Sequence, residues 1–445
     1  MTKRTRHKRP SETALPYLVV GDGCGNVFEV PELRMAGMTG TQVVAPRPKE
    51  LIDLPHGSEL FELPGHVPVG YDPQRGRFVE LPSYDGSPVV AVAAFMAPAH
   101  VQFLRAAWRK SADAPRLPFY SYTAVGWRGG RFMVPAVRVD PDNRQDPITV
   151  DCAAVERRAQ RMLARHEGNR LIEHLVNNCV RRYGCPAARN FMMGRWEAPL
   201  PTSPSCNADC VGCISRQSPA STVTAPQDRI AFVPSVDELL AVAVPHLERA
   251  PRAVVSFGQG CEGEPIMQAQ LLEESIRAIR RRTARGIINL NTNGCNPEAV
   301  ERLCRAGLDS IRVSMSSAQP SLYKRYYRPR GYTFDDAVES LKVIRRHNRW
   351  SSINYFVFAG LTDTEQEMTA LSTVVVSTQI NMIQARNLNI DPDWYLTEMG
   401  LGAAQSRGVV GVPRWLQWLS AEFPWVKVGY FNPPRSVMLR KHFAW

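Results

Sequence analysis

The sequence predicts an α/β protein built around an open, partial (βα)6 barrel, with a β-rich N-terminal domain and a short C-terminal extension. Two observations carry this prediction. From about residue 195 onward, buried-strand patterns alternate with helical patterns about six times in roughly 190 residues, which is typical of a parallel sheet with right-handed crossovers. Before residue 150, apolar runs are short and lie between glycine and proline turns, as in β-rich domains. Six units are fewer than the eight of a closed barrel.

The length of 445 residues is expected to give two or three domains. We place the N-terminal β-rich domain with its basic tail at 1–150, a helical connector at 151–194, the barrel core at 195–395, and an extension that caps the barrel at 396–445. In the N-terminal domain, strands are expected at Tyr17–Val20 and Val89–Ala93, hairpin turns at Arg75-Gly76 and Gly129-Gly130, and one helix near Ala99–Lys110.

The core elements follow from local signals. After one strand before residue 206, a capping box at Ser235–Glu238 predicts a helix that continues to about Arg249. Asn296 followed by a proline predicts a second helix start. The other expected strands lie at 253–257, 287–290, 310–315, 352–358 and 381–388, and the other helices at 267–283, 320–327, 334–347 and 363–378.

Composition narrows the class of protein. No apolar run reaches the roughly 18 residues of a membrane span, and no apolar signal core follows the basic N-terminus, so a cytoplasmic location is expected. There the 10 cysteines are expected to be core residues, nucleophiles or metal ligands rather than a disulfide framework. The net charge of +12 comes from basic residues spread along the chain, and no zinc-finger, RNP or KH signature accompanies it. Nucleic acid is therefore not an expected partner.

Three cysteines, Cys206, Cys210 and Cys213, lie on the loop after the first core strand. Their spacing lets three thiolates surround one metal centre. Iron–sulfur cubanes normally take four thiolates, so three would leave one iron open to a substrate or cofactor. The alternative is a zinc site that adds a distant Cys or His.

Polar residues also recur at the ends of the other strands. The second strand ends in Gly-Gln-Gly-Cys-Glu-Gly-Glu-Pro at 258–265, the third in Asn-Thr-Asn-Gly at 291–294, and the fourth carries Arg-Val-Ser-Met-Ser at 312–316. The sixth carries Gln-Ala-Arg-Asn-Leu-Asn at 384–389. Taken alone, 258–265 is equally compatible with a simple glycine-rich turn. Together these segments indicate one shared pocket, because buried strands do not leave polar groups unpaired.

The cysteine triplet and these strand-end motifs resemble the radical S-adenosylmethionine (radical SAM) superfamily, especially its molybdopterin-biosynthesis and peptide-maturing branch. The resemblance covers about 195–395. It implies that Cys206, Cys210 and Cys213 hold a [4Fe–4S] cluster whose free iron binds S-adenosylmethionine. Reduction would then give a 5′-deoxyadenosyl radical that abstracts hydrogen from a substrate. The implied cofactor-binding residues are Gly212, Gly263, Glu264, Pro265, Thr292 and Ser314, and the strand-end Arg386 joins them as a candidate.

Two positions depart from the family pattern. Gly212 stands where the residue before the third cysteine is usually aromatic, and Glu262 replaces the first glycine of Gly-Gly-Glu-Pro. Side-chain packing of residue 212 on the adenine is therefore lost.

The remaining cysteines allow a second iron–sulfur cluster, with Cys24, Cys179 and Cys185 as its ligands. Cys152 and Cys304 are expected in the core, and Cys261 and Cys295 are expected to line the pocket. His166 and His174 are expected to be ordinary, partly buried histidines. No cysteine follows residue 304, which argues against a C-terminal domain with auxiliary clusters.

The expected function is that of a radical SAM enzyme whose net reaction type (oxidoreductase, transferase or lyase) the sequence leaves undetermined. The expected partners are a reductant such as flavodoxin or ferredoxin and a substrate that is a peptide or protein, or a small metabolite. The alternative from another class is a non-catalytic, zinc-stabilised nucleic-acid-binding protein.

Overall fold

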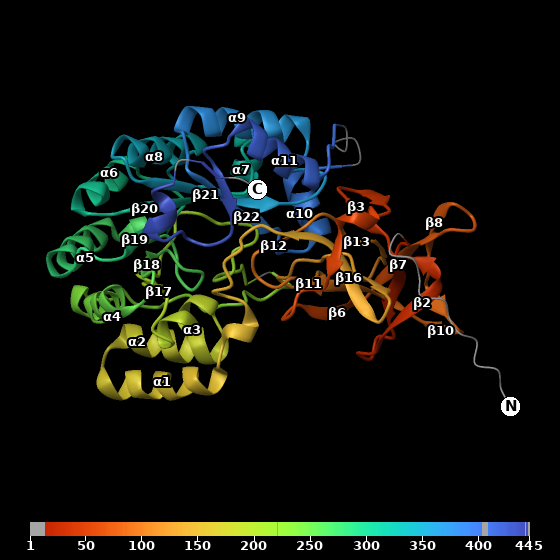
Figure 1. Cartoon of the computed structure of the whole chain (residues 1–445), viewed down its shortest axis with the longest axis horizontal. Helices are drawn as coiled ribbons and strands as arrows, with labels where there is room; N and C mark the ends of the chain where they lie inside the picture. The colour runs from red at the N-terminus through yellow and green to blue at the C-terminus, as the bar shows by residue number, and fades with distance from the viewer. Residues whose placement is uncertain (1–13, 220, 403–407, 441, 444–445) are drawn as a thin grey trace.

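The computed structural model describes residues 14–219, 221–402, 408–440 and 442–443. Figure 1 shows a β-rich N-terminal part, in red and orange, beside a larger α/β part, in green to blue, with the first helices below it. Of the helices in these ranges, none combines the length and apolar character that a membrane crossing requires. The predicted fold class is confirmed by the parallel sheet of the larger part and the antiparallel strands of the smaller one.

The core sheet, within the described residues, has seven strands that all pair in parallel with their neighbours. In spatial order they are β17 (Glu197–Pro199), β18 (Val254–Phe257), β19 (Ile287–Thr292), β20 (Ser310–Met315), β21 (Trp350–Val357), β22 (Met382–Asn387) and β23 (Lys427–Gly429). The first six are the predicted strands. The seventh, β23, was not predicted because three residues are too few to show a periodic pattern. It lies within the 396–445 extension, so part of that extension belongs to the sheet.

Helices cover the outer face of this sheet, as the peripheral ribbons of Figure 1 show. They are α4 (Val236–Arg249), α5 (Ala269–Arg282), α6 (Pro297–Ala306), α7 (Pro320–Tyr327), α8 (Phe334–Arg346), α9 (Glu365–Thr378), α10 (Pro392–Met399), α11 (Val412–Glu422) and α12 (Arg435–Met438). The predicted N-terminal caps of α4 and α6 are both present. Ser235 and Glu238 form a reciprocal capping box, and the Asn296 side chain accepts from the Ala299 N–H. The apolar faces of α4 to α11 pack on the sheet and close one large core, whereas α12 has no buried residue.

The N-terminal part contains an 11-stranded antiparallel sheet and smaller sheets among its described residues. Its strands are β1 (Tyr17–Gly21), β2 (Val27–Arg34), β3 (Gly37–Thr39), β4 (Gln42–Val44), β5 (Leu51–Asp53), β6 (Glu59–Leu63), β7 (His66–Asp72), β8 (Arg77–Glu80), β9 (Ser83–Tyr84), β10 (Ser87–Pro88), β11 (Val90–Phe95), β12 (His100–Gln102), β13 (Arg105–Ala106), β14 (Trp108–Lys110), β15 (Gly126–Arg128) and β16 (Arg131–Arg138). Both predicted hairpin turns are confirmed. Gly129 and Gly130 link β15 to β16 with φ values of 60° and 84°, a backbone region that suits glycine.

The helix predicted near Ala99–Lys110 is wrong. That segment forms the three short strands β12, β13 and β14, which pair with β16, β3 and β7 respectively. Val101, Leu104 and Trp108 have helical spacing, but three different partner strands take up the backbone hydrogen bonds. Tertiary pairing therefore overrides the local pattern.

The segment between the two parts is helical. It comprises α1 (Cys152–Arg165), α2 (Arg170–His174), a π-helical segment (Leu175–Arg182) and α3 (Pro186–Met192). The Asp151 and Asn169 side chains cap α1 and α2. A π-helical stretch is rare and is frequently found at functional sites.

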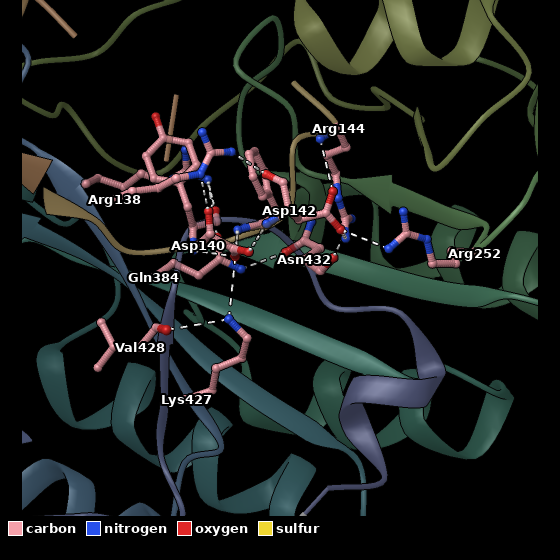
Figure 2. A network of polar contacts seen from close by, with 12 residues as sticks. Arg138, Asp140, Asp142, Arg144, Arg252, Gln384, Lys427, Val428 and Asn432 are labelled. Carbon is pink, nitrogen blue, oxygen red and sulfur yellow. Dashed lines mark hydrogen bonds and ion pairs between the residues drawn. The ribbon is translucent and has the colours of Figure 1, made fainter. Parts of the chain in front are cut away.

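Two sets of contacts fix the N-terminal part at the carboxyl ends of β22 and β23. The Gln102 N–H donates to the Asn387 side chain at 2.9 Å, at the last residue of β22. Just after β23, Asp140 accepts from the Tyr430 N–H at 3.0 Å, and Lys427 lies 3.5 Å from the same carboxylate. Figure 2 shows Asp140 and Lys427 together with the Asp142–Arg144 ion pair. The N-terminal part thus borders the sheet edge where strand-end side chains gather.

Candidate functional site

The cysteine loop follows β17 and rests on the end of α7. The Asp209 N–H donates to the Tyr327 carbonyl at 3.0 Å, and the Val211 N–H donates to the Tyr326 carbonyl at 2.9 Å. Inside the loop, the Cys213 N–H donates to the Cys210 carbonyl at 3.2 Å. These backbone bonds fix the path of a segment that has no regular secondary structure of its own.

The three loop thiols lie in a partly buried environment. Burial raises the pKa of Cys206 and raises that of Cys210 well above the usual range of a thiol. Both are therefore protonated near neutral pH until a cation binds, because a metal centre drives off the thiol protons. Arg229 donates from a guanidinium nitrogen to the Cys213 sulfur at 3.5 Å.

The spacing of these sulfurs favours a multinuclear centre. Among the described residues, the ligand groups that come within 4.8 Å of one another do not include Cys206, Cys210 and Cys213 as a trio. Thiolates on one tetrahedral zinc are only about 3.8 Å apart, given Zn–S bonds of about 2.3 Å. A cluster of several irons accepts more widely spaced thiolates. The donor set therefore fits a [4Fe–4S] cluster better than a single zinc ion.

The Gly263–Pro265 motif lies directly beside the segment that leads into the cysteine loop. The Gly263 N–H donates to the Ser203 carbonyl at 2.7 Å, and the Glu264 N–H donates to the Ser205 carbonyl at 2.8 Å. A Cβ at position 263 would lie 2.0 Å from the Ser205 oxygen. Only glycine therefore permits this approach of two backbones.

The Glu264 carboxylate connects the ends of β18 and β19. It accepts from the Thr292 hydroxyl, and from the Asn293 N–H at 2.7 Å. Burial raises the pKa of Glu264 to about 7. Pro265 then starts a 3₁₀ turn, Pro265–Gln268, which leads into α5.

Glu262, the first departure from the family pattern, has a structural explanation. Its buried carboxylate accepts from four backbone N–H groups at 2.7–3.0 Å, two on each oxygen. The donors are Thr202, Ser203, Gly258 and Gln259. Glu262 thus holds together the loops that follow β17 and β18, although burial raises its pKa to about 7.

Gly212, the second departure, faces a site that is already filled. A Cβ at this position would lie 2.6 Å from the Tyr326 hydroxyl oxygen and 2.7 Å from Cγ2 of Ile390. Tyr326 comes from α7 and is buried. An aromatic side chain at 212 is therefore excluded, and the aromatic ring near the third cysteine comes from a different element.

The other predicted cofactor-binding residues also lie at the carboxyl half of the sheet. The Thr292 hydroxyl is engaged by Glu264 and accepts from the Gly294 N–H at 3.0 Å. Arg386 donates to the Tyr430 carbonyl at 2.6 Å, and its guanidinium lies 3.6 Å from the centre of the Tyr430 ring. Ser314 is half-buried on β20. Their contacts to a cofactor stay predictions.

A polar network crosses the inner face of the sheet, and the sequence pattern did not identify it as a unit. Arg312 donates to Gln384 at 2.7 Å, and Gln384 donates to Asn432 at 2.9 Å. Asn432 in turn donates to Glu197 at 2.8 Å. Burial lowers the pKa of Arg312 to about 10. The sequence feature that could have revealed this network is the occurrence of polar residues inside otherwise apolar strands.

The second cluster predicted at Cys24, Cys179 and Cys185 stays a prediction, and the structure places Cys24 in a different part of the fold from the other two. Cys24 is exposed in the β1–β2 turn, where its N–H donates to Asp22 at 2.8 Å, and this turn belongs to the N-terminal part. Cys179 instead lies 3.5 Å, sulfur to sulfur, from Cys261, which was expected to line the pocket. Sequence spacing could not place Cys261 there because 82 residues separate the two cysteines.

Two further cysteine predictions have opposite outcomes. Cys304 is buried in α6, as predicted. Cys152 is exposed at the start of α1, so its placement in the core is wrong.

Part of the core matches the model of a known protein family. Residues 200–371 match the family model described as the Radical SAM superfamily, so this region is a radical SAM domain and the predicted family is confirmed. The matched region contains the cysteine loop, the Gly263–Pro265 motif, Thr292 and Ser314. A [4Fe–4S] cluster and S-adenosylmethionine are the cofactors of this family. A search of curated proteins finds no match.

Several solved structures are similar over part of their length. SuiB of Streptococcus suis, bound to the precursor peptide SuiA, is 12% identical over 55% of this chain and 53% of its own, with a TM-score of 0.34. The anSMEcpe protein with bound AdoMet is 16% identical over 43% and 50%, with a TM-score of 0.32. A radical SAM methyltransferase from Sphaerobacter thermophilus is 14% identical over 56% and 69%, with a TM-score of 0.37. The chain thus spans about half the length of the first two.

Proposed function

We propose that this protein is a radical SAM enzyme that starts its reaction at a [4Fe–4S] cluster held by Cys206, Cys210 and Cys213. The observation that carries the proposal is the direct backbone pairing of the segment before the cysteine loop with Gly263 and Glu264. This pairing brings the segment before the loop thiols and the Gly263–Pro265 segment together at one end of the sheet, which supports a shared cofactor site. When bound and reduced, the cluster would supply an electron that cleaves S-adenosylmethionine to a 5′-deoxyadenosyl radical.

The residues of the chain have separate tasks in this proposal. The three thiolates hold three irons and leave the fourth open to S-adenosylmethionine. Gly263, Glu264 and Pro265 bind its amino group, with the Glu264 carboxylate held in place by Thr292 and Asn293. Thr292 and Ser314 lie where family members contact the carboxylate or ribose. Arg386, already bonded to Tyr430, would contribute positive charge nearby rather than a free side chain.

The substrate is proposed to be a peptide or protein, with a small metabolite as the second candidate. The supporting observation is the position of the N-terminal part beside the carboxyl ends of β22 and β23, where active residues of such barrels lie. A hollow of about 390 Å³ also lies between the two parts, and Gly40, Arg325 and Gly360 contribute to its lining. A reductant such as flavodoxin or ferredoxin would supply electrons.

Metal and sulfide analysis tests the centre directly. Protein purified without oxygen should contain about four iron and four acid-labile sulfide per chain at the loop. Cys210→Ala should lose this iron, whereas Cys304→Ala changes a buried cysteine in α6 and should retain it. One zinc and no sulfide bound by the loop would contradict the proposal and favour the zinc-stabilised binding protein.

A further inference from the structure

A second group of ligand atoms lies outside the cysteine loop. His174 at the end of α2, Cys179 in the π-helical segment and Cys261 after β18 bring one ligand atom each to within 4.8 Å of one another. The Cys179 and Cys261 sulfurs are 3.5 Å apart, and both residues are only 2% exposed. No part of the proposed cofactor binding uses these three side chains.

Cys185 lies next to this group in the chain fold, although its sulfur is not among the ligand atoms that lie within 4.8 Å of one another. The Cys185 N–H donates to the Cys179 carbonyl at 2.7 Å, so the chain returns to the group after one turn. Cys185 could therefore supply a third thiolate to a cation bound by Cys179 and Cys261.

We propose that His174, Cys179 and Cys261 bind a single tetrahedral metal ion of the zinc type, and that Cys185 is recruited as the fourth ligand when the ion binds. This Cys3His donor set is that of a structural zinc site. The sulfur–sulfur distance of 3.5 Å is close to the roughly 3.8 Å expected between two thiolates on one zinc. It is far from the roughly 2.05 Å of a disulfide, which would also leave the histidine without a role.

The backbone around the group supports the same conclusion. Leu175–Arg182 is π-helical, and π-helical turns are rare and frequently lie at functional sites. Cys179 lies in this segment, with its sulfur against that of Cys261. Asn178 also lies 3.4 Å from Nε2 of His174, which fixes the imidazole in a local hydrogen-bond network.

The ion would join the helical segment to the loop that carries the S-adenosylmethionine motif. Cys261 immediately precedes Glu262, and its carbonyl accepts from the Ile230 N–H at 2.7 Å. Binding the Cys261 thiolate would therefore fix the start of the loop whose other residues are held by Glu262 and Glu264. The metal would act through position and would not take part in the reaction.

The test uses the full-length chain with Cys206, Cys210 and Cys213 all changed to Ala, so the proposed cluster cannot contribute. After zinc supplementation and dialysis, this protein should retain about one zinc per chain and no acid-labile sulfide. Cobalt substitution should give the strong visible bands of a tetrahedral thiolate site. Adding Cys179→Ser and Cys261→Ser should abolish metal retention, adding Cys185→Ser should weaken it at least tenfold, and adding Cys304→Ser should leave it unchanged.

A second measurement avoids substitutions in the site. In the unsubstituted protein, zinc should protect Cys179 and Cys261 from alkylation, and a chelator should expose them, as read by peptide mass spectrometry. Three results would overturn the proposal: no retained metal, a Cys179–Cys261 disulfide in place of metal, or labile sulfide in the variant without the loop cysteines. Because that variant lacks the loop cysteines, the outcome does not depend on the proposed function.

Discussion

Replacing Glu262 by Gln should destabilise the protein and weaken its binding of S-adenosylmethionine. The carboxylate accepts four backbone N–H groups, two on each oxygen, and the Thr202 hydroxyl also donates to it at 3.1 Å. In Gln one oxygen becomes an NH2 group, which faces two N–H donors instead of accepting from them. Whichever way the amide turns, two backbone donors lose their acceptor.

The magnitude follows from those two lost bonds. Hydrogen bonds to charged groups contribute about 1.5–3 kcal/mol each, so the free energy of unfolding should fall by about 3–6 kcal/mol. The assay is denaturant unfolding of the metal-free protein, with calorimetric titration of S-adenosylmethionine into the loaded protein. Glu248→Gln, at an exposed position near the end of α4, is the matched control and should change stability by less than about 0.5 kcal/mol. An equally small change for Glu262→Gln would refute the assigned role.

Three further predictions concern neighbouring residues. Gly263→Ala should abolish S-adenosylmethionine binding, measured by titration, because its Cβ would lie 2.0 Å from the Ser205 oxygen; unchanged affinity would contradict the close approach. Gly212→Ala should lower the free energy of unfolding by about 1–3 kcal/mol, and Tyr326→Phe in the same chain should recover part of the loss; no recovery would show that the hydroxyl is not the obstacle. Binding of S-adenosylmethionine should strengthen as the pH rises through about 7, since the raised pKa of Glu264 keeps it protonated and neutral at lower pH; the same pH profile in Glu264→Gln would exclude this carboxyl as the cause.

The elements that carry strong local signals were predictable. The capping box at Ser235 and the apolar runs of β18 to β22 contain enough information within a few residues to define a helix start and buried strands. β23 was missed because three residues carry no period. The segment of β12, β13 and β14 was misassigned because its apolar spacing fits a helix, while its structure depends on partner strands distant in sequence.

In the candidate site too, features set by residues close in sequence were predictable, and features set by contacts distant in sequence were not. Cys206, Cys210 and Cys213 are close in sequence, so spacing alone brought them together as a candidate. Cys179 and Cys261 meet only because the helical segment packs beside the loop after β18, and no sequence pattern records that contact. Glu262 looked like an irregularity in a motif, and its role became apparent only from the four donors that converge on it from two loops.

Formation of 5′-deoxyadenosine is the most direct test of the central claim. Protein with a full iron and sulfide content, mixed with S-adenosylmethionine and dithionite without oxygen, should produce 5′-deoxyadenosine, quantified by liquid chromatography. Cys210→Ala should produce none, and Cys304→Ala should match the unsubstituted protein. If the fully loaded protein binds S-adenosylmethionine but forms no 5′-deoxyadenosine, the cysteine loop does not initiate radical chemistry and the account is contradicted.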